Sequence, residues 1–170
     1  MPPLYQATLQ LLADGREYLA SISATQYQQP INILSQSSIG QHSRHWIEFF
    51  QCLIGQVINQ SCEICYDDRV RDLQLESDPE AALAAVHQIE HELSQLELSQ
   101  KLQLKAQVSE DTIVLPTSLS RELWYAIEHA IHHLAIIKIG WKALGNLPEL
   151  PADFGIAYST RLHRKQLVEN

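Results

Sequence analysis

Positive charge is scarce in this chain. Its 170 residues include 12 Lys and Arg against 20 Asp and Glu, which gives a formal net charge of −8. A protein that binds nucleic acid as its main partner needs a basic surface to neutralise phosphates. The sequence contains no run of Lys or Arg that could form one. The composition therefore argues against nucleic acid as a partner.

Long apolar segments and export signals are also missing. The longest apolar run contains Arg121, Glu122 and Glu128 together with three histidines, which argues against a membrane span. The first residues, Met1 to Gln6, lack the basic region that opens a signal peptide. The chain has three cysteines, and an odd number without an export signal fits a reducing compartment. These features predict a cytoplasmic protein with no membrane partner.

Several common catalytic motifs are absent from the sequence. There is no Glu-x-x-His, which a ferritin-like di-iron site needs twice, and no His-Glu-x-x-His of zinc proteases. Neither a Gly-x-Gly-x-x-Gly motif nor a Walker phosphate loop occurs, and no Gly-x-Ser-x-Gly suggests a hydrolase nucleophile. No side chain stands out as a dedicated catalytic nucleophile.

The chain does contain strong helical periodicity. Apolar residues recur at helical spacing and predict helices at about residues 3–23, 38–66, 77–96 and 119–144. Ser38 with Gln41 and Ser77 with Glu80 have the capping-box pattern, and Thr117 or Ser118 is expected to cap the last helix.

The segment between the third and fourth helices has a different pattern. Residues 102–108 alternate between apolar and polar, and residues 112–115 are rich in β-branched side chains. This predicts a short hairpin or extended connection, and the tail after Gly145 is expected to be loop-rich. The whole chain, residues 1–170, is therefore expected to form one all-α domain: a four-helix bundle whose long crossover contains a short extended, hairpin-like segment.

The most informative stretch lies in the last predicted helix and reads Glu128-His129-Ala130-Ile131-His132-His133. His129 and His133 are four residues apart, which puts both imidazoles on one helix face with Cβ atoms about 5–6 Å apart. Their neighbours are apolar nearly all round, as in a buried helix. Two imidazoles placed in this way can share one divalent cation.

A second histidine pair, His42 and His45, opens the second predicted helix. Bundles build metal sites from facing helices, so one of these two could join His129 and His133 in a three-imidazole site. Such a site leaves coordination positions open, as in catalytic metal centres. Imidazole ligands favour zinc or nickel, with iron and manganese as alternatives. The competing interpretation is that these are core histidines paired with carbonyl groups or with Glu128.

A third histidine pair has the same spacing but different surroundings. His87 and His91 lie among polar residues and off the apolar stripe of their helix, so they are expected on its flank or in solvent. Cys62 and Cys65 form a lone Cys-x-x-Cys without a second pair or a βαβ context, and are expected to pack at a helix end.

Two arginines follow the second predicted helix. Arg69 and Arg71 belong to a mixed-charge segment, which is typical of a solvated surface with local ion pairs. The alternative is that one of them borders the metal site and meets an anionic substrate.

The order of the two histidine clusters resembles that of DinB-like proteins. The stretch from Ser38 to Trp46 is similar to the opening of their second helix, and His129-Ala130-Ile131-His132-His133 is similar to the paired histidines of their last helix. The similarity spans roughly residues 4–157. DinB-like proteins are four-helix bundles, usually homodimers, that typically hold a divalent metal with three histidines.

The resemblance implies particular roles for the histidines. It implies His45, His129 and His133 as metal ligands, because the family's first ligand usually falls seven residues after the helix-capping serine. His42 and His132 then become residues that line the site or support its ligands, and Glu128 is a candidate for the same role.

The resemblance also implies a function. DinB-like proteins include thiol transferases, which use low-molecular-weight thiols such as bacillithiol or mycothiol, and metal-dependent hydrolases. We therefore expect a metal-dependent enzyme for thiol transfer or hydrolysis of a small-molecule substrate, since a metal with open positions lowers the pKa of a bound thiol. A homodimer is expected as well. The alternative is a non-catalytic helical bundle that binds a ligand or a partner.

Overall fold

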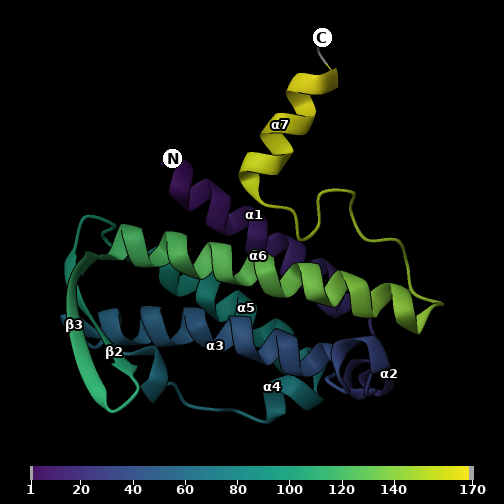
Figure 1. The fold of residues 1–170 in the computed structure, drawn as a ribbon, viewed down its shortest axis with the longest axis horizontal. Helices are drawn as coiled ribbons and strands as arrows, with labels where there is room; N and C mark the ends of the chain where they lie inside the picture. The colour runs from purple at the N-terminus through teal and green to yellow at the C-terminus, as the bar shows by residue number, and fades with distance from the viewer. Residues whose placement is uncertain (1, 169–170) are drawn as a thin grey trace.

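Four long helices carry most of the computed structural model, which describes residues 2–168 (Figure 1). They are α1 (Pro3–Ala20), α3 (Ile39–Ile58), α5 (Pro79–Leu93) and α6 (Leu119–Leu144). Shorter helical segments connect or follow them: α2 (Ala24–Gln28), α4 (Gln74–Ser77), α7 (Tyr158–Val168) and the 3₁₀ turns η1 (Asn32–Leu34) and η2 (Tyr66–Asp68). Within residues 2–168, no helix combines the length and the apolar character needed to cross a membrane.

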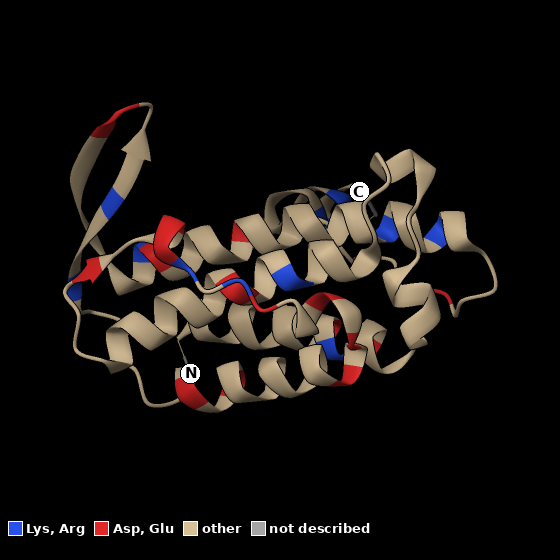
Figure 2. Ribbon diagram, turned by 90° about the horizontal axis from the view of Figure 1, so that it is seen from below, with Lys and Arg blue, Asp and Glu red and all other residues tan. Residues whose placement is uncertain are grey.

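Three strands form a mixed sheet in the order β1-β2-β3. Strands β2 (Lys101–Val108) and β3 (Asp111–Ser118) make an antiparallel hairpin that extends beyond the ends of the helices (Figure 2). Strand β1 (Glu63–Ile64) adds to β2 in parallel, with Ile64 opposite Leu104.

The expectation of an all-α four-helix bundle is therefore wrong. Seven helices and a three-stranded sheet give the described residues a mixed helix-and-strand fold. The extended segment after α5 does not remain an isolated connection, because its backbone pairs with residues that directly follow α3. A pairing across about forty residues leaves no local pattern in the sequence.

Several helix boundaries also differ from those expected. The second long helix was expected to reach residue 66 but ends at Ile58, where Gln60 adopts a left-handed conformation and Ser61 N–H bonds back to the Gln56 carbonyl. This early stop frees the following residues to form β1. Residues 24–37, between the first two expected helices, contain α2 and η1, and the expected loop-rich tail contains α7.

Two of the three expected helix caps are found in the structure. Ser38 caps α3 in a complete capping box with Gln41, and Ser118 caps α6 by accepting a bond from Arg121 N–H. The cap of α5 is Asp78 rather than the expected Ser77, which instead belongs to α4.

The core lies between the long helices, with α3 packed against α6 and α1 against α5. Tyr18 and Trp46 are fully buried there, and Trp46 Nε1 donates to the Tyr18 hydroxyl at 3.1 Å. Gly40 in α3 lets α4 approach closely, since a Cβ at that position would collide with the Glu76 carbonyl. The segment that contains α4 is thereby held against α3.

Candidate metal centre

Two packed helices supply the histidines of the candidate site. The capping box at Ser38 fixes the start of α3, so His42 and His45 lie in its first two turns. His129 and His133 lie one turn apart in the middle of α6. Because α3 and α6 run side by side, the two sets meet between the helices (Figure 1).

Three of these histidines converge on one point. His45, His129 and His133 each offer one ring nitrogen, and these atoms all lie within 4.8 Å of one another. Their ring centroids are separated by 4.6 to 5.0 Å. A divalent cation with N–metal bonds of roughly 2.0–2.1 Å holds donor atoms about 3–4 Å apart. Small side-chain rotations would close the remaining distance.

Burial keeps these imidazoles neutral. Loss of hydration, followed by the neighbouring histidines, lowers the pKa of His133 from 6.5 to about 3. Burial likewise lowers the pKa of His45 and of His129 to about 4, with a nearby histidine as the next contribution in each case. Neutral imidazole is the form that binds a metal, so the site needs no deprotonation near neutral pH.

The Nε2 atom of His129 gives an independent test of whether these residues fit a divalent metal. It is buried and has no hydrogen-bond partner among the described residues. A buried polar atom without a partner costs roughly 1–3 kcal/mol. A cation bound to this nitrogen would satisfy it, and the three-nitrogen donor set suits zinc, nickel or iron. The residues present therefore fit a divalent metal.

His42 lies next to the three-histidine cluster and contacts His133. Its Nδ1 is 3.2 Å from His133 Nδ1, so one of the two rings donates to the other. If His133 is the donor, its Nε2 lone pair is left free to bind a cation, and His42 holds that tautomer in place. The position of His42 suits the supporting role that the resemblance implies for it.

The other two candidates are more peripheral. His132 is exposed and meets His133 edge-on with a centroid distance of 5.5 Å. Glu128 is exposed, and within residues 2–168 no hydrogen bond or ion pair joins it to the histidines. Pairing of the core histidines with Glu128, the alternative considered from the sequence, is therefore not seen.

Aromatic rings that the sequence did not single out form one wall of the site. Phe49 stacks on His129 with ring centroids 4.0 Å apart, and Tyr66 stacks on Phe49 with ring centroids 4.8 Å apart. Tyr125 lies 6.1 Å from His129. Helical spacing could have revealed two of them, because Phe49 follows His45 by four residues and Tyr125 precedes His129 by four.

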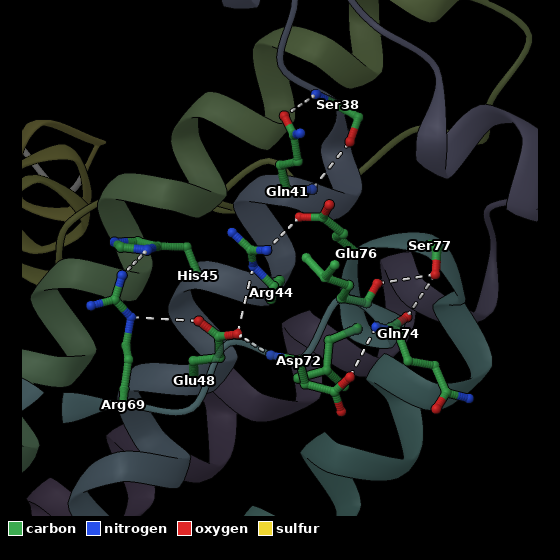
Figure 3. A network of polar contacts seen from close by, with 12 residues as sticks. Ser38, Gln41, Arg44, His45, Glu48, Arg69, Asp72, Gln74, Glu76 and Ser77 are labelled. Carbon is green, nitrogen blue, oxygen red and sulfur yellow. Dashed lines mark hydrogen bonds and ion pairs between the residues drawn. The ribbon is translucent and has the colours of Figure 1, made fainter. Parts of the chain in front are cut away.

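A buried carboxylate with two arginines flanks the cluster (Figure 3). Glu48 is nearly fully buried and accepts a 2.9 Å bond from Asp72 N–H. Its carboxylate lies 3.6 Å from Arg44 Nε and 3.5 Å from Arg69 Nε, and Arg44 also pairs with Glu76 at 2.8 Å. Burial raises the pKa of Glu48, while the Asp72 N–H and the two arginines act in the opposite direction.

Only one of the two candidate substrate-binding arginines reaches the histidines. Arg69 Nη2 lies 3.4 Å from His45 Nδ1 (Figure 3). Arg71 is exposed, and no contact of its side chain with the cluster exists in the part of the chain that the structure describes. Arg69 was weighed from the sequence as a site-border residue, but its counter-charge Glu48 was missed.

The remaining sequence candidates lie outside the site. His87 and His91 are exposed on α5, as expected. Cys62 and Cys65 flank β1 rather than ending a helix, and both are free thiols, as is Cys52. Cys52 Sγ donates to the Cys65 carbonyl at 3.3 Å, which ties the second half of α3 to the residue that precedes η2.

Comparison with known proteins gives little further guidance. No family model matches the chain, and no solved structure matches it. One curated protein with a similar segment is FK506-binding protein 5 of Rhizopus delemar, which is 36% identical over 107 residues. The match covers 59% of this chain but 27% of that protein, so the chain spans only about a quarter of its relative. These similarities assign the chain to no family.

Proposed function

We propose that this protein is a divalent-metal-dependent enzyme of the DinB-like type, with His45, His129 and His133 as the metal ligands. The observation that carries the proposal is the convergence of three neutral imidazoles within 4.8 Å of one another, one of them with an unpartnered buried Nε2. Zinc or nickel is the preferred metal, with iron or manganese as alternatives.

The proposed reaction is transfer of a low-molecular-weight thiol or hydrolysis of a small-molecule substrate. Three protein ligands leave coordination positions open, and a divalent cation held there lowers the pKa of a thiol or water that binds it. Around it, His42 holds the tautomer of His133, and the stacked rings of Phe49 and Tyr66 cover one side. No protein nucleophile is required.

We also propose a homodimer in the cytoplasm. The three free thiols support a reducing compartment. An apolar hollow of about 590 Å³ lined by residues of α1, α6 and α7, including Leu4, Trp124 and Tyr158, supports a partner on that face. Trp124 is 43% exposed, which is high for so large an apolar side chain.

Metal binding is the decisive test of the proposed function. Protein purified without a histidine tag and stripped with chelator should take up about one divalent ion per chain, measured by titration and elemental analysis. His45→Ala should weaken binding sharply, because two imidazoles hold a cation less well than three.

A matched control uses the other histidine pair with the same spacing. The double variant His87→Ala, His91→Ala should bind metal as the parent does, because both residues are exposed on α5. Loss of binding in that variant would mean that His87 and His91, rather than the proposed three histidines, bind the metal. A parent that binds nothing tighter than millimolar would favour the alternative, a non-catalytic protein whose histidines only pack.

A further inference from the structure

Arg69 is an unexpected neighbour for a metal ligand. Its Nη2 lies 3.4 Å from His45 Nδ1. A guanidinium has N–H donors and no acceptor, so in this contact Arg69 donates and His45 Nδ1 accepts. Nδ1 therefore carries no proton in this contact, and the single proton of the neutral ring is on Nε2.

This hydrogen bond and metal binding by His45 exclude each other. If Nδ1 is the ligand atom, the lone pair that accepts from Arg69 is the one the cation needs. If Nε2 is the ligand atom, the proton moves to Nδ1, and two N–H donors then face each other. In either case the bond between Arg69 and His45 must break when the cation binds.

The guanidinium is held in place by its other contacts. Arg69 Nη1 donates to the Tyr66 carbonyl at 3.0 Å, and Nε lies 3.5 Å from the buried carboxylate of Glu48. The guanidinium carbon also lies 5.4 Å from the centre of the Phe49 ring. Loss of the contact with His45 therefore leaves a charged N–H group beside the cluster rather than releasing the side chain to solvent.

We propose that Arg69 is the residue that selects an anionic substrate group at this centre. Once its bond to His45 is broken, Nη2 donates to a carboxylate or thiolate of the small molecule that occupies an open position. The inference rests on the proposed metal site and specifies its substrate class. In the absence of such an anion, the positive charge of Arg69 opposes the cation and weakens metal binding.

The proposal predicts two effects of opposite sign for one substitution. Cobalt(II) is the probe, and affinity is followed through its visible absorption. Arg69→Met should bind cobalt about tenfold more tightly than the parent, since both the competing donor and the opposing charge are gone. The cobalt-loaded variant should bind acetate about tenfold more weakly, since a charge-assisted hydrogen bond is lost. A purely structural role for Arg69 would not move the two affinities in opposite directions.

Two further comparisons serve as controls for the experiment. Arg69→Met in a Glu48→Gln background, compared with Glu48→Gln alone, avoids leaving a buried carboxylate without its partner. Arg71→Met removes an exposed arginine two residues away and should change neither affinity. Acetamide, the neutral counterpart of acetate, should bind the parent and the Arg69 variants equally.

The outcomes separate the two proposals. If the parent does not bind cobalt, the metal site is wrong and the role of Arg69 falls with it. If the parent binds cobalt but Arg69→Met binds it no more tightly, or binds acetate as well as the parent does, only the role of Arg69 is refuted.

Discussion

Replacement of His129 by Phe should stabilise the metal-free protein. The imidazole of His129 stacks on Phe49 with centroids 4.0 Å apart and planes 26° from parallel, and a phenyl ring can keep that contact. Its Nε2, which is buried without a partner among the described residues, would be removed. Removing such an atom is expected to raise the free energy of unfolding by about 1–3 kcal/mol.

The same substitution should abolish the stabilisation that metal provides. For a chain of this size, each kcal/mol changes the melting temperature by roughly 2–4 °C, so His129→Phe should melt a few degrees above the parent in chelator. At a free metal concentration about 1,000 times its Kd, the parent gains about 4.1 kcal/mol, whereas the variant gains far less. The order of the two melting temperatures should therefore reverse on adding metal.

Thermal unfolding followed by circular dichroism, with and without zinc, measures both effects. His91→Phe on the exposed face of α5 serves as the control and should follow the parent in both conditions. If His129→Phe melts well below the parent in chelator, His129 is a well-satisfied packing residue, and the reasoning from its unpartnered nitrogen is wrong.

Two more predictions concern pH and assembly. In chelator, the free energy of unfolding should fall as the pH drops from about 7 to about 5. In the native protein the pKa is about 4 for His45 and His129 and about 3 for His133, against 6.5 for an ordinary imidazole. Over that pH range the unfolded chain therefore takes up protons that the native rings do not, which favours unfolding. Urea unfolding curves measure this, and stability that stays constant or rises over that range would contradict it. Sedimentation at micromolar concentration should give about twice the chain mass of 19.3 kDa, and Trp124→Glu should shift the mass toward the monomer. A parent that sediments only as a monomer would exclude the dimer.

Short-range features of the fold could be read from the sequence. The bounds of α6 (Leu119–Leu144) and the capping box between Ser38 and Gln41 were predicted correctly. So was the placement of His129 and His133 on one face of α6. Helical periodicity and helix caps act within a few residues, so the physical chemistry that produces them is written locally in the chain.

The sheet could not be read in this way. Residues 102–108 and 112–115 were predicted as a short hairpin or extended connection, and they do form the β2–β3 hairpin. The parallel partner of β2, however, is Glu63–Ile64, which a local pattern assigned to a helix. Helical propensity continued through those residues, and the gain from pairing with a distant strand outweighed it. The all-α expectation was wrong because that gain depends on contacts that form only after the chain has collapsed.

The candidate metal site shows the same division between what local sequence determines and what packing decides. The sequence by itself determined that α3 and α6 each carry a pair of histidines. Helical spacing left His42 and His45 as alternatives, and only the resemblance to DinB-like proteins favoured His45. Packing of α3 against α6 groups His45 with His129 and His133 and places His42 behind His133. Docking of the segment after β1 then brings Arg69 to His45 and to buried Glu48. Such partners are fixed by how elements pack, and that packing is set by the whole core rather than by neighbouring residues.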